Sequence, residues 1–411
     1  MKNSKRTHSA ILALTATIMA AGGAQAYELK LGTNMPPIDI HGFASQGFLA
    51  STKYNYLANN TKDGSFKFSE AAVNVSMNPF PRTHIAAQGF LFDVGNVGQY
   101  YPALDYASID YTFCDQFGVR AGRIRRPEGI YNAIQDVDLA RTSILLPQGM
   151  YDARYRDFSG SIDGGSLFGN VNMSKAGSFS YEAYLGNVNL TDDGGIARLL
   201  QDDFGKAPTQ YKGVEGFTEG GVQLWWNTPI DGLRAGFAMY DALGFGYKYN
   251  VNIPPNLGGG LYHAQLDSPT EHYSLEYTVK NWTFQTEYKH NGYESYTVHN
   301  GVSTGGVVHS AADVWYAGAA YRFNKWFETG VYYTEDYANV DDRDGSKTGK
   351  GSDAYQKDLA LSLRFDPKPW WVIKAEVHYI RGTALLDDNL DNPSRNGDGW
   401  FMLAMKTTVS F

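Results

Sequence analysis

Apolar and polar side chains alternate with a period of two in segment after segment of this chain. In residues 356–365, Leu359, Leu361 and Leu363 share one parity, while Asp358 and other polar or small residues share the opposite parity. A period of two is typical of a β-strand with one apolar and one polar face. The repeated pattern predicts an all-β fold in which every strand separates two different environments.

The alternation predicts sixteen strands. Their expected spans are residues 37–49, 65–78, 81–93, 104–114, 117–125, 156–171, 178–188, 219–227, 232–241, 270–280, 281–291, 312–323, 325–335, 356–365, 370–380 and 399–411. The connections alternate strictly between short and long, and the longest covers about residues 126–155. Transmembrane antiparallel β-barrels have short turns at one rim and long loops at the other. An even number of strands places both chain ends at the short-turn rim.

Composition agrees with a transmembrane β-barrel. The chain has 8 Trp, 29 Tyr, 22 Phe and 45 Gly, yet its mean hydropathy is only −0.37. Strands with one lipid-facing and one water-facing side produce this combination. All eight tryptophans are expected at strand ends, where aromatic girdles mark the membrane interfaces. A soluble β-sandwich is the alternative, but sixteen strands without edge protection would be unusual in one.

The first residues have the features of a secretory signal peptide. Lys2, Lys5 and Arg6 precede an apolar run at 10–21 and a small-residue site, Ala24-Gln25-Ala26. We expect cleavage after Ala26, which leaves a barrel domain at residues 27–411. Loss of three positive charges changes the formal charge from −8 to −11, and so acidic a product argues against nucleic acid as a partner. A single cysteine, Cys114, allows no internal disulfide.

One local motif resembles a known family. A predicted strand ends at Gly122-Arg123 and is followed by Arg126-Pro127-Glu128-Gly129. This order is similar to that of the Gram-negative outer-membrane porins, nearest the group that contains the phosphate-selective porins. The resemblance implies a sixteen-stranded barrel in outer-membrane lipid, assembled as a homotrimer, without a cofactor. It also implies that the barrel-assembly machinery reads the terminal Phe411.

The same resemblance implies that the loop at about 126–155 folds into the lumen and forms the constriction. Opposed charges in a narrow passage create a field that orders polar solutes. The alternative is that these charges pair with one another and hold the loop in place. The candidates on and beside the loop are Arg125, Arg126, Glu128, Tyr131, Asp136, Asp138, Arg141, Arg154 and Arg156.

Strand parity predicts further lumen-facing residues. They are Asp110, Arg120, Glu276, Glu287, Lys289, Arg322, Glu328, Arg364, Lys374, Glu376 and Lys406. His378 shares a face with Lys374 and Glu376. Both signs are present, and the segment 127–150 has a formal charge of −2 from three acids and one arginine. A pore built for phosphate alone would instead require a concentration of basic residues.

The expected function is a passive, water-filled channel for ions and small hydrophilic solutes. A substrate-specific channel for small anions or organic acids is the alternative, with Arg120, Arg125, Arg126, Arg154 and Arg156 as its binding groups. An enzyme built on a barrel is a third possibility, but the sequence has neither a His-Glu-x-x-His nor a Gly-x-Ser-x-Gly motif. The acidic clusters lack the spacing of a calcium loop, so no metal site is expected. Small residues on the early strands suit subunit packing: Gly42, Ala44, Ala71, Ala86 and Ala87.

Overall fold

The computed structural model describes residues 27–30, 36–58, 60–95, 97–192, 194–204, 208–386, 392, 395 and 399–411. The predicted signal peptide lies outside the described residues. None of the described helices is long and apolar enough to span a membrane.

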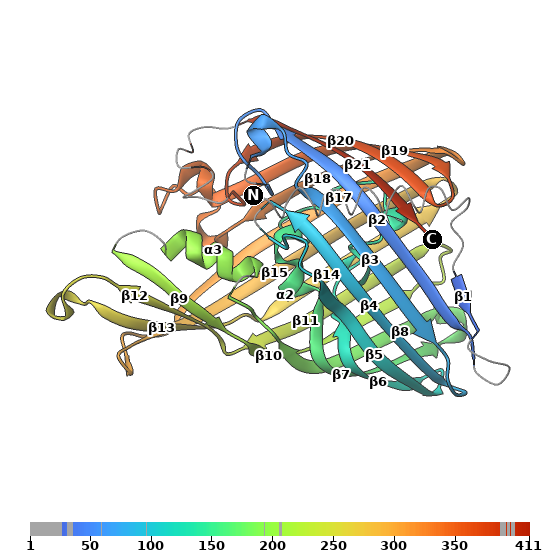
Figure 1. The fold of residues 1–411 in the computed structure, drawn as a ribbon, viewed down its shortest axis with the longest axis horizontal. Helices are drawn as coiled ribbons and strands as arrows, with labels where there is room; N and C mark the ends of the chain where they lie inside the picture. The colour runs from blue at the N-terminus through green and yellow to red at the C-terminus, as the bar shows by residue number, and fades with distance from the viewer. Residues whose placement is uncertain are drawn as a thin grey trace.

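Sixteen antiparallel strands form a closed barrel (Figure 1). In ring order they are β2 (Ile38–Ser51), β3 (Phe68–Met77), β4 (Thr83–Val94), β5 (Ala103–Cys114), β6 (Phe117–Arg125), β7 (Ser161–Asn172), β8 (Ser178–Val188), β10 (Phe217–Asn227), β11 (Leu233–Leu243), β14 (Thr270–Val279), β15 (Trp282–His299), β17 (Val308–Asn324), β18 (Phe327–Tyr337), β19 (Tyr355–Lys368), β20 (Trp371–Gly382) and β21 (Trp400–Ser410). Pairing of β21 with β2, with Ser410 opposite Phe43, closes the ring. The prediction of a sixteen-stranded antiparallel barrel is confirmed.

The outer face of the barrel is apolar, as the alternation predicts. Leu359 and Leu361 are 47% and 48% exposed, whereas Ala360 and Ser362, which face inward, are 0% and 1% exposed. The apolar side chains of the other strands are exposed in the same way, among them Leu167, Leu185, Met239, Leu275, Val331, Leu403 and Met405. A band of exposed apolar side chains around a closed barrel is the surface that lipid requires.

Two tryptophans differ from the expected girdle. Trp315 lies inside β17 rather than at its start, because that strand begins at Val308. Trp400 starts β21 but is only 1% exposed. Its ring packs edge-on against Tyr54 and Tyr56, with centroid distances of 5.7 and 5.5 Å. Trp400 therefore lies inside the barrel against two tyrosines and not at the membrane interface.

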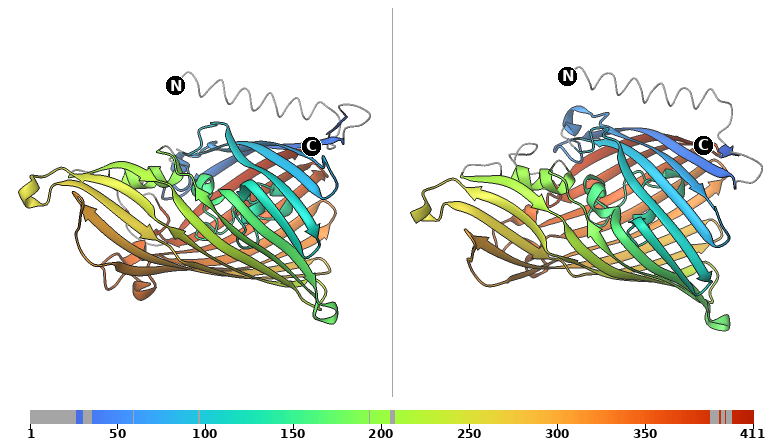
Figure 2. Two further views of the ribbon diagram at one scale, coloured as in Figure 1. Left: turned by 90° about the horizontal axis from the view of Figure 1, so that it is seen from below. Right: turned by 60° about the horizontal axis from the view of Figure 1, so that its bottom comes forward.

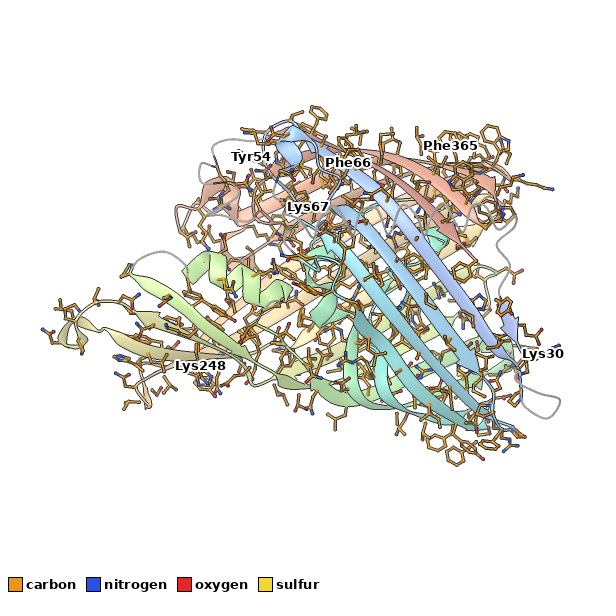
Figure 3. The ribbon with its side chains drawn as sticks, in the orientation of Figure 1. Lys30, Tyr54, Phe66, Lys67, Lys248 and Phe365 are labelled. Carbon is orange, nitrogen blue, oxygen red and sulfur yellow. The ribbon has the colours of Figure 1, made fainter. Side chains whose placement is uncertain are left out.

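An external extension of the barrel was not predicted. The strands β9 (Thr209–Glu215), β12 (Phe245–Val251) and β13 (Gly260–Asp267) pair in that order, and β13 pairs with the outer part of β15, which also carries the short β16 (Val302–Ser303). This sheet projects well beyond the rest of the barrel (Figure 2). Lys248 lies on it, and Phe365 lies at the opposite, short-turn rim (Figure 3).

The extension escaped prediction because its strands are separated from the barrel strands by breaks in the period of two. Gly244, with a φ of +81°, interrupts the path from β11 to β12. Residue 216 separates β9 from β10, and residues 268–269 separate β13 from β14. At Gly244 the parity of the inward-facing side chains changes, because Ala242 and Phe245 pack in one cluster although they are three residues apart. Residues 268–269 interrupt the strand without changing parity, since Ala264 and Thr270 are both buried.

The chain between β6 and β7, residues 126–160, is here called the inner loop. It contains the short helices η2 (Asn132–Ile134), η3 (Asp138–Ala140), η4 (Ala153–Tyr155) and α2 (Arg156–Ser159). The strand predicted from residue 156 therefore starts later, at Ser161. A longer helix, α3 (Gly195–Phe204), lies beside β9 (Figure 1). The terminal Phe411 exchanges backbone hydrogen bonds of 2.9 and 3.0 Å with Gly42 of β2.

Candidate channel constriction

The inner loop is fixed to one side of the barrel wall by Glu287 of β15. One of its carboxylate oxygens accepts a hydrogen bond of 2.8 Å from the backbone amide of Ile130. The same carboxylate accepts 2.6 Å bonds from Tyr151 of the loop and from Ser274 of β14, and lies 3.1 Å from Nε2 of His272. Glu287 is 1% exposed. A buried carboxylate with this many donors holds the loop backbone in a defined position.

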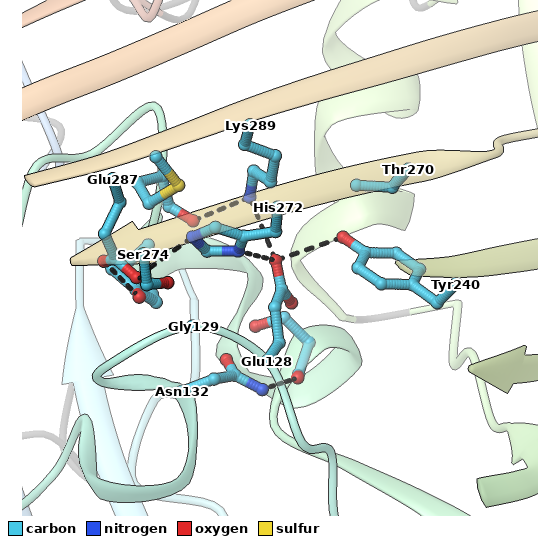
Figure 4. A network of polar contacts seen from close by, with 12 residues as sticks. Glu128, Gly129, Asn132, Tyr240, Thr270, His272, Ser274, Glu287 and Lys289 are labelled. Carbon is cyan, nitrogen blue, oxygen red and sulfur yellow. Dashed lines mark hydrogen bonds and ion pairs between the residues drawn. The ribbon is translucent and has the colours of Figure 1, made fainter. Parts of the chain in front are cut away.

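Glu128 of the inner loop adds a network of charges at the same place (Figure 4). Its carboxylate lies 2.6 Å from Nη2 of Arg126 and 3.3 Å from Nζ of Lys289. His272 and Tyr240 contact the same carboxylate at 3.3 and 3.1 Å. Burial opposes ionisation, but the charges of Lys289 and Arg126 hold the pKa of Glu128 well below its usual range. Glu128 is therefore a buried anion that links the loop to the wall.

Gly129 is required by this arrangement. Its φ is +56°, in the left-handed region that favours glycine. A Cβ atom at this position would lie 2.3 Å from Oη of Tyr151 and 2.5 Å from Cε1 of His272. The backbone conformation and the close neighbours of Gly129 therefore explain why a glycine follows Glu128 in the porin-like motif.

The far end of the inner loop is fixed to the other side of the wall. Glu376 of β20 accepts bonds of 2.9 Å from the amides of both Ile144 and Leu145. The carboxylate of Glu376 also lies 2.9 Å from Nε2 of His378, and Nδ1 of His378 lies 2.9 Å from Asp358 of β19. The two walls therefore use the same device, a glutamate that receives loop amides and contacts a histidine.

Lysines complete the second anchor. Nζ of Lys374 donates to the carbonyl oxygens of Asp138, Arg141 and Ser143 at 2.7, 2.7 and 3.0 Å. Nζ of Lys406 on β21 lies 2.8 Å from the carboxylate of Asp138. Burial opposes ionisation of Asp138, but Lys406 and Lys374 keep its pKa below the usual range. Because the first anchor involves β11, β14 and β15 and the second involves β19 to β21, the loop crosses the lumen.

A third cluster lies where the loop returns to the wall. Arg125 contacts Asp105 at 2.6 Å and Asp136 at 3.0 Å, and Arg156 contacts Asp105 at 3.0 Å. Gln88 of β4 donates a 2.7 Å bond to Asp136. Burial opposes ionisation of Asp136, and Arg156 and Arg125 lower its pKa to about 2.

Thirteen of the sixteen predicted site residues are buried, with exposed fractions of 1–8%: Arg126, Glu128, Tyr131, Asp136, Asp138, Arg141, Arg154, Arg156, Glu287, Lys289, Arg364, Lys374 and Glu376. Each loop arginine has a carboxylate within 3.2 Å, Arg141 with Asp138 and Arg154 with Asp152 among them. These contacts agree with the alternative given above, in which the charges pair with one another and hold the loop in place. Their role as pore-lining groups stays a prediction.

Arg120 and Arg322 do not join the buried clusters. They lie on the wall nearer the short-turn rim, with side chains 25% and 30% exposed. Arg120 pairs with Asp110 and Glu182 at 2.8 and 2.9 Å, and Arg322 pairs with Glu328 at 2.6 Å. Both side chains are therefore paired and partly exposed, and their role in lining the pore stays a prediction.

Several anchoring residues were missed in the sequence. They are Asp105, Glu219, His272 and Asp358, and their contacts join them to residues that the sequence analysis named. Strand parity could have identified two of them as inward-facing. His272 shares a face with Ser274 and Glu276, and Glu219 shares a face with Gln223. Within the part of the chain described, no group of three or more His, Cys, Asp or Glu side chains is placed to hold a metal ion.

A closed sixteen-stranded barrel with a long loop across its lumen is the fold of the outer-membrane porins. Similar solved structures include OmpT of Vibrio cholerae (TM-score 0.53, 13% identity, 94% of this chain and 100% of that chain). The anion-selective porin from Comamonas acidovorans has a TM-score of 0.53 at 8% identity over 92% of this chain and 100% of that chain. OmpF of Salmonella typhi in complex with daunomycin has a TM-score of 0.55 at 12% identity over 94% of this chain and 100% of that chain.

At these identities, the likeness establishes the fold alone. No protein-family model matches the chain, and no curated protein matches its sequence.

Proposed function

We propose that the protein is a porin of a Gram-negative outer membrane, a passive water-filled channel for ions and small hydrophilic solutes. The observation that carries this proposal is the crossing of the lumen by the inner loop. Arg126 holds one end to Glu219 of β10 at 3.0 Å, and Lys406 of β21 holds the region of Asp138 at 2.8 Å. A barrel of sixteen strands has an aqueous bore, and a segment anchored across that bore sets its narrowest point.

The apolar outer face supports placement of the barrel in lipid. Export would follow cleavage of the signal peptide after Ala26, and the barrel-assembly machinery would read Phe411. The proposed role is transport without catalysis, which agrees with similar folds named as channels, such as DcaP of Acinetobacter baumannii.

A homotrimer is part of the proposal, and one of the similar folds is named as a trimer form. Val73 and Val75 of β3 and Ile85 of β4 are 48%, 39% and 37% exposed on the outer wall. Ala87 shares this outer face with Ile85, whereas Ala86 faces inward. Apolar and small side chains of this kind suit packing of one barrel against another. The mass of the detergent-solubilised protein, corrected for bound detergent, should correspond to three chains.

Planar-bilayer recording with the purified protein tests the proposal. Insertion should produce stepwise, ohmic increases in current, and liposomes containing the protein should admit small neutral solutes. Absence of steps from correctly folded protein would overturn the proposal.

A further inference from the structure

A cluster of aromatic and charged side chains lies where β17, β18 and β19 approach the long-loop rim. Its centre is the carboxylate of Glu335, which accepts hydrogen bonds of 2.7 Å from the hydroxyl groups of Tyr333 and Tyr337. Nζ of Lys357 on β19 donates to this carboxylate at 2.9 Å, and Nε1 of Trp315 on β17 donates at 3.3 Å. These five residues are here called the rim cluster. Four donors from three strands hold it together.

Strand register places the rim cluster on the lipid-facing side of the barrel. Lys357 pairs with Glu335 and has the same parity as Leu359 and Leu361, which are exposed on the outer wall. Gln356, of the opposite parity, is buried inside the barrel. Lys357 is therefore the outward-facing residue next to Leu359 on the side of the long-loop rim. The rim cluster thus borders the apolar band directly.

Two arginines lie beside the rim cluster. Arg343, in the loop after β18, contacts the carboxylate of Asp313 of β17 at 2.6 Å. Its guanidinium lies 4.9 Å from the ring centre of Tyr337, and Nζ of Lys357 lies 5.5 Å from the same centre. Arg381 of β20 is the direct cross-strand partner of Lys357. Two strands and one loop therefore bring three cations together.

The cations are accessible, whereas the acids that contact them are largely covered. The side chains of Arg343 and Lys357 are 53% and 31% exposed, and Arg381 is an exposed residue as well. The side chains of Asp313 and Glu335 are only 6% and 16% exposed. The charged groups that this surface presents to the outside are therefore cationic.

Two acids of the loop between β18 and β19 have partners of their own. Asp342 accepts hydrogen bonds from the backbone amides of Lys347 and Thr348 at 3.0 and 2.9 Å. Asp353 lies 3.1 Å from the guanidinium of Arg395. These carboxylates are held by the loops and do not belong to the cationic surface.

The surroundings of the cations indicate which kind of anion fits them. Tryptophan and tyrosine side chains such as Trp315 and Tyr333 are typical of the level of lipid headgroups. A free anion would reach the cations from water without any contact with the neighbouring apolar band. A lipid instead places its phosphate at the level of the cations while its acyl chains cover Leu359 and the residues below it. Arginine and lysine are the side chains that proteins use to bind phosphate.

We infer that this surface binds the phosphate group of a membrane lipid in the leaflet at the long-loop rim, through Arg343, Lys357 and Arg381. The inference goes beyond the proposed function, because it depends on the position of the barrel in lipid and not on conduction. Since Arg343 belongs to the loop after β18, a bound phosphate also ties that loop to the membrane surface.

Lipid binding to the native protein in detergent tests the inference without any substitution. Native mass spectrometry should show tighter binding of dioleoylphosphatidic acid than of dioleoylphosphatidylcholine, which has the same acyl chains but a phosphate masked by choline. Added salt should weaken the binding of the first lipid. Equal affinity for the two lipids would overturn the inference. Displacement of the bound lipid by an equal concentration of inorganic phosphate would also overturn it, because the site would then be one for free anions.

Variants locate the binding on this surface. Arg343→Gln and Lys357→Gln should each weaken binding of dioleoylphosphatidic acid by about fivefold, as expected for the loss of one basic residue at a charged lipid. The second variant leaves Glu335 with its three aromatic donors, so the rim cluster keeps its fold.

Lys248→Gln is the matched control. Lys248 also contacts a glutamate, Glu215, and its side chain is 43% exposed, but it lies on the external extension (Figure 3). This variant should bind the lipid as the native protein does, and equal affinity of all three variants would overturn the inference. Lipid binding by a protein that does not conduct would support this site while contradicting the proposed channel.

Discussion

The carboxylate of Glu287 accepts a hydrogen bond from the backbone amide of Ile130 at 2.8 Å. Glu376 repeats this relationship on the other wall with Ile144 and Leu145, and each glutamate also contacts a histidine, at 3.1 and 2.9 Å. Backbone amides of the inner loop are thus held by wall carboxylates at two places. The position of the loop follows from the wall residues as much as from the loop's own sequence.

Substitution Glu376→Gln should loosen the far end of the loop. The amide side chain keeps the shape but loses the charge that strengthens bonds from Ile144 and Leu145, and hydrogen bonds to charged groups contribute roughly 1.5–3 kcal/mol. We expect greater open-channel current noise and faster cleavage of the loop by added protease. Glu271→Gln, at the outer surface of β14, is the control. Identical noise and cleavage in the Glu376→Gln variant and the native protein would contradict this anchor.

Substitution Asp138→Asn should lower stability. It removes the charge that lies 2.8 Å from Nζ of Lys406 and 4.0 Å from that of Lys374. Breaking a buried pair by removing one partner destabilises by about 3–5 kcal/mol. The folded barrel migrates on a gel at a position different from that of the unfolded chain, and the temperature at which the folded band disappears should fall. Asp341→Asn, a substitution at an exposed residue, should leave that temperature unchanged. An unchanged temperature for Asp138→Asn would show that this pair does not hold the loop.

Acid should release the loop at Asp136. Its pKa falls from 3.8 to about 2 in the folded protein, so its stabilisation is complete above the ordinary value and is lost as pH falls through the lower one. Conductance and loop cleavage should therefore be constant down to about pH 4 and change between about pH 4 and 2. In the Asp136→Asn variant, the change in conductance and cleavage between these pH values should be smaller, because the titrating carboxylate is absent. A transition centred near neutral pH would contradict this assignment.

Substitution Gly129→Ala should displace the first anchor. The added Cβ would lie 2.3 Å from the Tyr151 hydroxyl, and the φ of +56° disfavours alanine. Strain of this kind amounts to roughly 1–3 kcal/mol. We expect altered conductance and a lower unfolding temperature. Gly305→Ala, where a Cβ meets nothing within 4 Å, is the control, and equal behaviour of the two variants would refute the crowding around Gly129.

The sequence predicted the barrel well because lipid and water on opposite faces impose a period of two, which residues 356–365 follow without interruption. It did not predict the extension, because Gly244 changes the parity between β11 and β12 and residues 268–269 interrupt the path from β13 to β14. It also named most of the charged residues that meet at the anchors but not which of them pair, and their role in lining the pore stays a prediction. Lys374 and Asp138 are 236 residues apart in the chain, so only the closed barrel brings them together.

The central claim, that the inner loop restricts the bore, is tested most directly by single-channel conductance of a protein without that loop. Asn132 bonds the carbonyl oxygens of Arg126 and Ser159 at 2.9 and 3.0 Å, so residues 133–158 can be replaced by a short glycine-serine linker without separating the ends. The account predicts a conductance at least about twofold higher, because a sixteen-stranded barrel without an internal segment has a wide aqueous bore. An unchanged conductance from a folded variant would contradict it.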